Sequence, residues 1–109
     1  MANFRDFSNI LKDDLIELGK KELKENADAL VKDGQDYIKE IEEDLKMWTQ
    51  QLAVGEMSVD GFKMAVAGKA ELAKMKAITQ IGLKEINIDK LKQGILNTVV
   101  ATATKTFLA

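Results

Sequence analysis

The side chains of this sequence that could carry chemistry are carboxylates, lysines, hydroxyls and a single tyrosine, because the chain contains no cysteine and no histidine. Without cysteine there are no disulfides, thiolate nucleophiles or zinc–thiolate sites, and without histidine the usual general base is missing. The densest group of carboxylates is the run Glu40-Ile41-Glu42-Glu43-Asp44. Hard divalent cations take such oxygen ligands, but the run lacks the loop, glycine turn and ligand spacing of an EF-hand. We therefore expect a solvated helix face there, with no metal and no cofactor.

Lysines dominate the second half of the chain and could contact phosphates. The single arginine, Arg5, and the net charge of −2 argue against a nucleic-acid-binding protein, whose contact face is strongly basic. The glycines form neither a G-x-G-x-x-G nor a G-x-x-x-x-G-K-[ST] loop. No spacing predicts a catalytic constellation, so we expect a protein that is not an enzyme. The lysines are Lys63, Lys69, Lys74, Lys76, Lys84, Lys90 and Lys92.

The elements that position these side chains are predicted to be helices throughout. The 109 residues include no proline, and alanine, leucine, lysine, glutamate and methionine are abundant. Proline removes a helical N–H donor and clashes with the preceding turn, so its absence favours uninterrupted helix. We predict one all-α domain over residues 1–109, with an acidic helical half (1–54), a turn (55–58) and a basic, apolar helical half (59–109).

The turn has clear local signals. Gly55 suits the left-handed position that follows a helix end, and Ser58 suits the N-cap of the next helix. A second helix start is predicted at Asn87, with Asp89 in its first turn, although an uninterrupted helix is the alternative there.

The first half has a seam of apolar residues at three- and four-residue steps, which the path Leu15, Gly19, Leu23, Ala27 keeps in phase. This favours one helix over residues 4–53, roughly 75 Å long at 1.5 Å per residue. Gly34 is the competing break, with Asp36 as a new N-cap. We favour continuity, because Gly34 occupies a seam position where a close helix approach needs a small residue.

Charge divides the chain. Residues 1–57 hold 8 basic and 14 acidic side chains (net −6), and residues 58–109 hold 8 basic and 4 acidic (net +4). Opposite charges favour an antiparallel hairpin of the two halves, although exposed pairs contribute only about 0–1 kcal/mol each. Because two long helices enclose no core alone, the hairpin must associate into an oligomeric helical bundle, or fold into a four-helix up-down bundle with breaks near Gly34 and Asn87.

The segment from Gln93 to Thr104 carries no charge and is too short for a transmembrane helix. Three interpretations compete: a core helix, an oligomer interface and an interfacial membrane anchor. We favour the first two, and the function they predict is a non-enzymatic, cytoplasmic helical assembly protein, a homo-oligomer that contacts a protein partner. The alternative is a peripheral lipid-binding protein that acts through this segment. The candidate interface residues are Leu96, Val99, Val100, Ala103 and Phe107.

Overall fold

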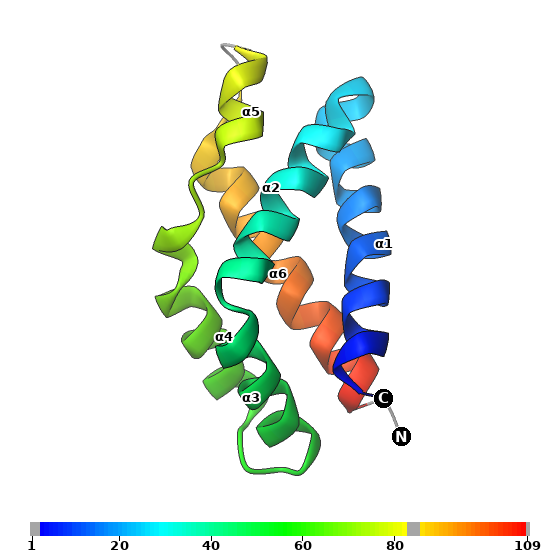
Figure 1. The fold of residues 1–109 in the computed structure, drawn as a ribbon, viewed down its shortest axis with the longest axis vertical. Helices are drawn as coiled ribbons and strands as arrows, with labels where there is room; N and C mark the ends of the chain where they lie inside the picture. The colour runs from blue at the N-terminus through cyan, green and yellow to red at the C-terminus, as the bar shows by residue number, and fades with distance from the viewer. Residues whose placement is uncertain (1–2, 83–85, 109) are drawn as a thin grey trace.

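The computed structural model describes residues 3–82 and 86–108, and in these residues every regular element is a helix. Lys84 lies outside them. Figure 1 shows a chain that runs along the long axis four times in alternating directions: α1 upward, α2 and α3 downward, α4 and α5 upward, and α6 downward. The whole measures 43 × 23 × 19 Å. The all-α prediction is confirmed. The elements are α1 (Phe4–Leu23), η1 (Lys24–Asn26), α2 (Ala27–Glu40), α3 (Glu42–Ala53), α4 (Val59–Gly68), η2 (Ala70–Leu72), α5 (Lys76–Ile81) and α6 (Ile88–Phe107).

The predicted continuous helix over residues 4–53 is wrong, because the chain folds back after Leu23. Asn3 and Asp6 form a capping box that begins α1, and Lys24, with a positive φ of 49°, ends it. The short η1 then leads into α2, which packs against α1 in the opposite direction (Figure 1). A helix of roughly 75 Å at 1.5 Å per residue would also exceed the longest dimension of the molecule, 43 Å.

Gly34 does not break the chain, so the alternative boundary at that residue is wrong as well. It lies inside α2 and is buried. A Cβ atom there would lie 3.0 Å from Leu15 Cδ1 of α1, a tight contact that fits the close helix approach predicted at Gly34. The second interruption falls at Ile41, between α2 and α3, where the buried isoleucine has φ −105° and ψ 14°.

The predicted turn between the halves is confirmed. Gly55 has a φ of +80°, and the Ser58 side chain accepts a 2.9 Å hydrogen bond from the Gly61 N–H at the start of α4. The start of α6 is confirmed too, because Asn87 Oδ1 accepts a 3.0 Å hydrogen bond from the Lys90 N–H. Both cap residues therefore act as their side-chain chemistry predicts.

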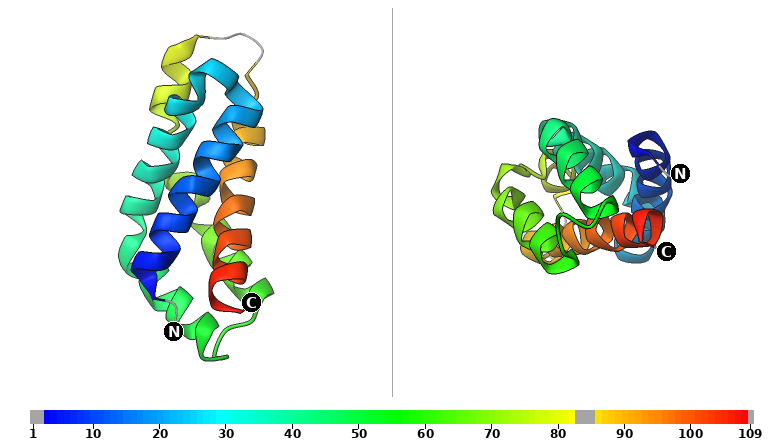
Figure 2. Two further views of the ribbon diagram at one scale, coloured as in Figure 1. Left: turned by 90° about the vertical axis from the view of Figure 1, so that its right-hand side faces the viewer. Right: turned by 90° about the horizontal axis from the view of Figure 1, so that it is seen from below.

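The core lies between the helices and is closed by α6 packing against α1. Figure 2 shows α1 between α2 and α6, and the rings of Phe7 and Phe107 have centroids 5.9 Å apart. Inside the bundle the Tyr37 hydroxyl donates a 3.0 Å hydrogen bond to the Val66 carbonyl. The largest fully buried side chains are Phe7, Leu15, Leu30, Ile41, Leu45, Leu52, Phe62, Val66, Ile78, Ile95 and Val99.

The attraction predicted between the halves has a local counterpart in two ion pairs. Lys69 Nζ of the basic half lies 3.5 Å from Asp44 Oδ2, and Lys105 Nζ lies 2.8 Å from Asp14 Oδ2. In both pairs the acid belongs to the first half and the lysine to the second. The two halves thus meet through pairs of opposite charge, while hydrophobic burial is the dominant favourable contribution to folding.

Candidate interaction surface

The acidic run forms no ligand cluster. Glu40 ends α2, Glu42 lies 3.8 Å from Lys46, and Asp44 pairs with Lys69. Among residues 3–82 and 86–108, no group of three or more acidic side chains could hold a metal ion. The run is therefore a charged helix surface, in which two carboxylates are paired with lysines.

The tyrosine is a structural group. Burial raises the pKa of Tyr37 to about 12, and its hydroxyl proton is directed at the Val66 carbonyl. A phenol with that pKa stays protonated at neutral pH. Its hydrogen bond joins α2 to α4.

The C-terminal segment supplies core. Leu96, Val99 and Ala103 are at most 4% exposed and pack inside the bundle. Val100 and Phe107 are half-buried and pack against the same core. Leu96, Val99 and Ala103 therefore lie in the core of the chain itself and present no surface to a partner in this fold, whereas Val100 and Phe107 are partly exposed.

Asp14 forms the most connected polar cluster of α1 and α6. The Thr102 hydroxyl donates a 2.6 Å hydrogen bond to Asp14 Oδ2, and the Lys105 ammonium contacts both carboxylate oxygens, at 2.8 and 3.1 Å. Burial of Asp14 favours its neutral acid, but the hydrogen bonds from Lys105 and Thr102 and the charge of Lys105 outweigh burial and lower its pKa.

This cluster predicts a pH-dependent contribution to stability. A carboxyl whose pKa is lower in the folded than in the unfolded chain stabilises the fold above its unfolded pKa, about 3.9 for aspartate. The contribution is lost as the pH falls through the folded pKa. Asp14→Asn should therefore lower the free energy of unfolding at pH 7 and make a smaller difference at pH 3, as measured by urea denaturation.

The control for this prediction is Asp13→Asn. Asp13 is exposed, and no salt bridge in the part of the chain that the structure describes includes it. Its effect should be small at both pH values. An equal effect of Asp14→Asn at pH 3 and pH 7 would contradict the assignment.

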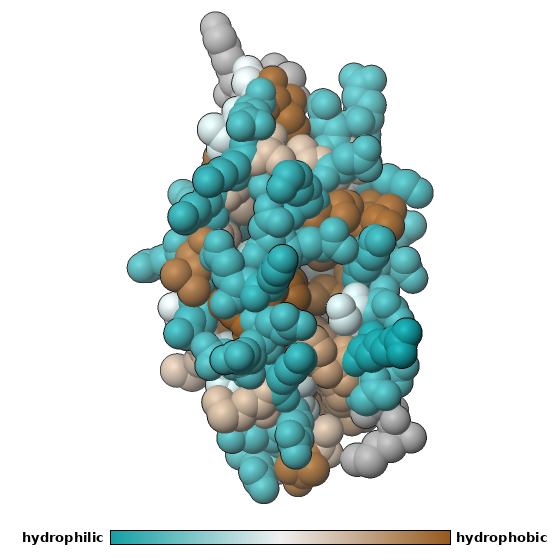
Figure 3. Space-filling model, in the orientation of Figure 1, coloured by the Kyte–Doolittle hydropathy of each residue, from teal (hydrophilic) through white to brown (hydrophobic). Residues whose placement is uncertain are grey.

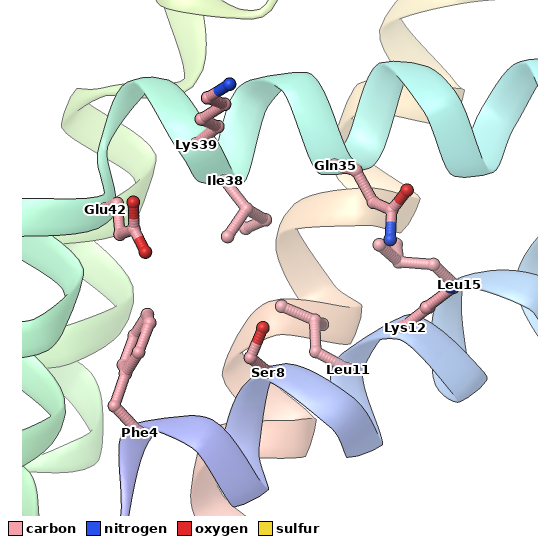
Figure 4. A pocket seen from close by; sticks show the side chains of 9 residues that line it. All are labelled: Phe4, Ser8, Leu11, Lys12, Leu15, Gln35, Ile38, Lys39 and Glu42. Atoms are coloured by element: carbon pink, nitrogen blue, oxygen red, sulfur yellow. The ribbon is translucent and has the colours of Figure 1, made fainter.

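A groove of about 320 Å³ separates the first turns of α1 from α2 and α3. Figure 4 shows Phe4, Ser8 and Leu11 of α1 facing Ile38 of α2 and Glu42 of α3 across it. Its base is the buried side chains of Leu11 and Leu15. Glu42 is the single carboxylate among the residues that line the groove. Its other lining residues are Lys12, Gln35 and Lys39.

Exposed large apolar side chains gather on one part of the chain. Among the described residues five are at least 44% exposed, and four of these lie between positions 47 and 72. Met47 projects from α3, Val54 follows α3, Met64 projects from α4, and Leu72 ends η2. We call these four residues the α3–η2 surface. Helices α3 and α4 contact each other, and Figure 3 shows that brown apolar groups on the viewed face are separated by hydrophilic ones.

Our sequence reasoning missed the α3–η2 surface, although a signal for it exists. Met47 stands two residues after the seam residue Leu45, and Met64 stands two residues after Phe62. A two-residue step turns a helix by about 200°, so these methionines project away from the core. An apolar residue on the outer face of an amphipathic helix indicates an exposed apolar side chain, and this pattern predicts the exposure of both methionines.

No family model matches this chain, nor does any curated protein or solved structure. Among the helices that the structure describes, none is long and apolar enough to cross a membrane.

Proposed function

We propose that this chain is a non-enzymatic helical assembly protein that associates with further copies of itself through the α3–η2 surface. The observation that carries the proposal is the exposure of Met64, which is 75% exposed on a helix whose apolar side chains Phe62 and Val66 are fully buried. Met47 of the neighbouring helix α3 and Val54, which follows it, are further exposed apolar side chains, at 50% and 54% exposure. Methionine is common at contact surfaces because its flexible thioether adapts to a partner.

Charge supports a second copy as the occupant. The outer face of α3 carries Glu43 beside Met47, whereas exposed lysines, Lys63 and Lys74, lie along the segment that carries Met64 and Leu72. The carboxylates of α3 in one copy are complementary in charge to Lys63 and Lys74 of another, whereas Asp60 and Glu71 leave the α4–η2 segment as a whole neutral. Such a contact joins two different surfaces, and it generates a ring if the rotation closes and a filament if it does not.

Sedimentation velocity over a wide range of protein concentration tests the proposal. We expect the wild-type chain to form oligomers and Met64→Glu to shift it toward monomer, because the substitution places a carboxylate in the apolar contact. The matched control is Asn9→Glu, which adds the same charge at an exposed position of α1. Circular dichroism should show equal helix content in all three proteins.

Two results would refute self-association through this surface. The first is a wild-type chain that stays monomeric at every concentration, and the second is equal dissociation by Asn9→Glu and Met64→Glu. Deleting the chain from Gln93 onward is a poor test, because it removes core residues such as Ile95 and Val99.

Lipid binding through the C-terminal segment stays a hypothesis that vesicle co-flotation tests. No exposed apolar face of that segment supports it.

A further inference from the structure

Residues 73–82 form a segment, which we call the strap, that lies along α2. The helix of the strap, α5, has 6 residues, and a helix of this length has little stability in water by itself. Left-handed backbone conformations stand at its two ends, at Met75 with φ 51° and at Gly82 with φ 71°. Met75 adopts this costly conformation while 98% buried, so its packing must hold it there.

One carboxylate joins the strap to α2. Asp33 Oδ1 accepts a 2.9 Å hydrogen bond from the Ala77 N–H, and Asp33 Oδ2 accepts a 2.8 Å hydrogen bond from the Ile78 N–H. These are N–H groups of the first turn of α5, which have no partner inside the helix. Asp33 is 5% exposed, so both hydrogen bonds are shielded from water.

The rest of the attachment is narrow. Met75 and Ile78 are the only side chains of residues 74–82 that are buried, and the helix that α5 contacts most closely is α2. Ala73, the first residue of the strap, lines a small cavity together with Tyr37 of α2 and with Ile95 and Leu96 of α6. The strap therefore covers apolar side chains that are otherwise part of the core.

We infer that the strap opens as a unit while the rest of the bundle stays folded, and that Asp33 is the latch that holds it closed. Opening ends the two hydrogen bonds to Asp33, releases the left-handed Met75 and uncovers Tyr37, Ile95 and Leu96. Sub-global openings of this kind are typical of segments with few buried contacts. The inference is independent of self-association through the α3–η2 surface.

Native-state hydrogen exchange of the intact chain in low concentrations of urea tests the inference. In the wild type, the amides of Ile78, Thr79 and Gly82 should exchange about tenfold or more faster than those of α6 from Ile95 to Ala103, and with a weaker urea dependence. Asp33→Asn keeps one acceptor oxygen, which is now uncharged and weaker, and replaces the other with an NH2 group that cannot accept a hydrogen bond. The strap amides should then exchange at least about tenfold faster still. The control is Asp36→Asn, at an exposed carboxylate paired with Lys32 within α2.

Two outcomes would overturn the inference. In one, the strap amides of the wild type share the rate and urea dependence of the α6 amides, which means that they exchange only by global unfolding. In the other, Asp33→Asn changes the exchange rates of the strap amides no more than Asp36→Asn does. If Asp33→Asn fails to fold, Ile78→Val gives a milder loosening of the strap, and its strap amides should still exchange faster than those of α6 and with the weaker urea dependence.

Discussion

Phe62→Ala should lower the free energy of unfolding by about 3–5 kcal/mol, the range typical of removing a buried aromatic side chain. Phe62 is fully buried in α4. The aromatic ring fills space between helices that are held by their own caps and turns, so collapse around the vacancy is restricted. Because a domain of this size has a total stability of about 5–15 kcal/mol, the variant should be close to its folding limit. Urea denaturation followed by circular dichroism measures the change.

The control for Phe62→Ala is Lys63→Ala, the same truncation at the adjacent exposed position of the same helix. Its effect should stay within about 0.5 kcal/mol, as is usual for surface substitutions. If both variants lost similar stability, or if Phe62→Ala cost less than about 1 kcal/mol, the packing described for α4 would be wrong.

Gly19→Ala should destabilise the chain by about 2–3 kcal/mol, because it forces apart the backbones of α1 and α2. A Cβ atom at Gly19 would lie 2.8 Å from the Ala27 carbonyl oxygen and 3.2 Å from its Cα atom. These are backbone atoms, which cannot rotate away as a side chain can. Alanine is the better helix former by about 1 kcal/mol, so the measured loss is the clash minus this gain.

A series of three glycine-to-alanine substitutions separates the clash from helix propensity. At Gly34 the new Cβ atom would lie closest to the methyl groups of Leu15, at 3.0 and 3.1 Å, and these side-chain atoms move more easily than backbone atoms do. At Gly68, the last residue of α4, nothing lies within 4 Å. The urea midpoint should fall most for Gly19→Ala, less for Gly34→Ala, and rise for Gly68→Ala. Any other order would argue against the close approach of α1 and α2 at Gly19.

The parts of the fold that the sequence predicts correctly depend on neighbouring residues. Ser58 and Asn87 cap helices through N–H groups three residues further on, and Gly55 adopts the left-handed turn because it has no Cβ atom. The fold-back after Leu23 has no such signal, since no glycine or proline stands at Lys24. Gly19 keeps a continuous seam in phase, yet in the structure it makes room for the first residue of α2.

Other features depend on contacts between distant residues and are therefore hidden from local patterns. The interruption between η2 and α5, near Met75, is stabilised by Asp33, whose hydrogen-bond partner Ile78 lies 45 residues away. The candidate interface residues of α6 show the same limit. Apolar periodicity indicates that Val99 and Ala103 share a buried face, but it does not tell whether this chain or another one covers that face.

The packing of α6 against α1 also sets an order of events during synthesis. Chains emerge from the ribosome N-terminus first, and domains usually complete their folding as units. Helices α1 and α2 can pair early, because they adjoin in the sequence. The contacts of Phe7 with Phe107 and of Asp14 with Thr102, which lies 88 residues further on, can form only after α6 has been synthesised. The side of α1 that packs against α6 therefore remains uncovered until α6 has been made, and this interval is when the nascent protein most needs protection from aggregation.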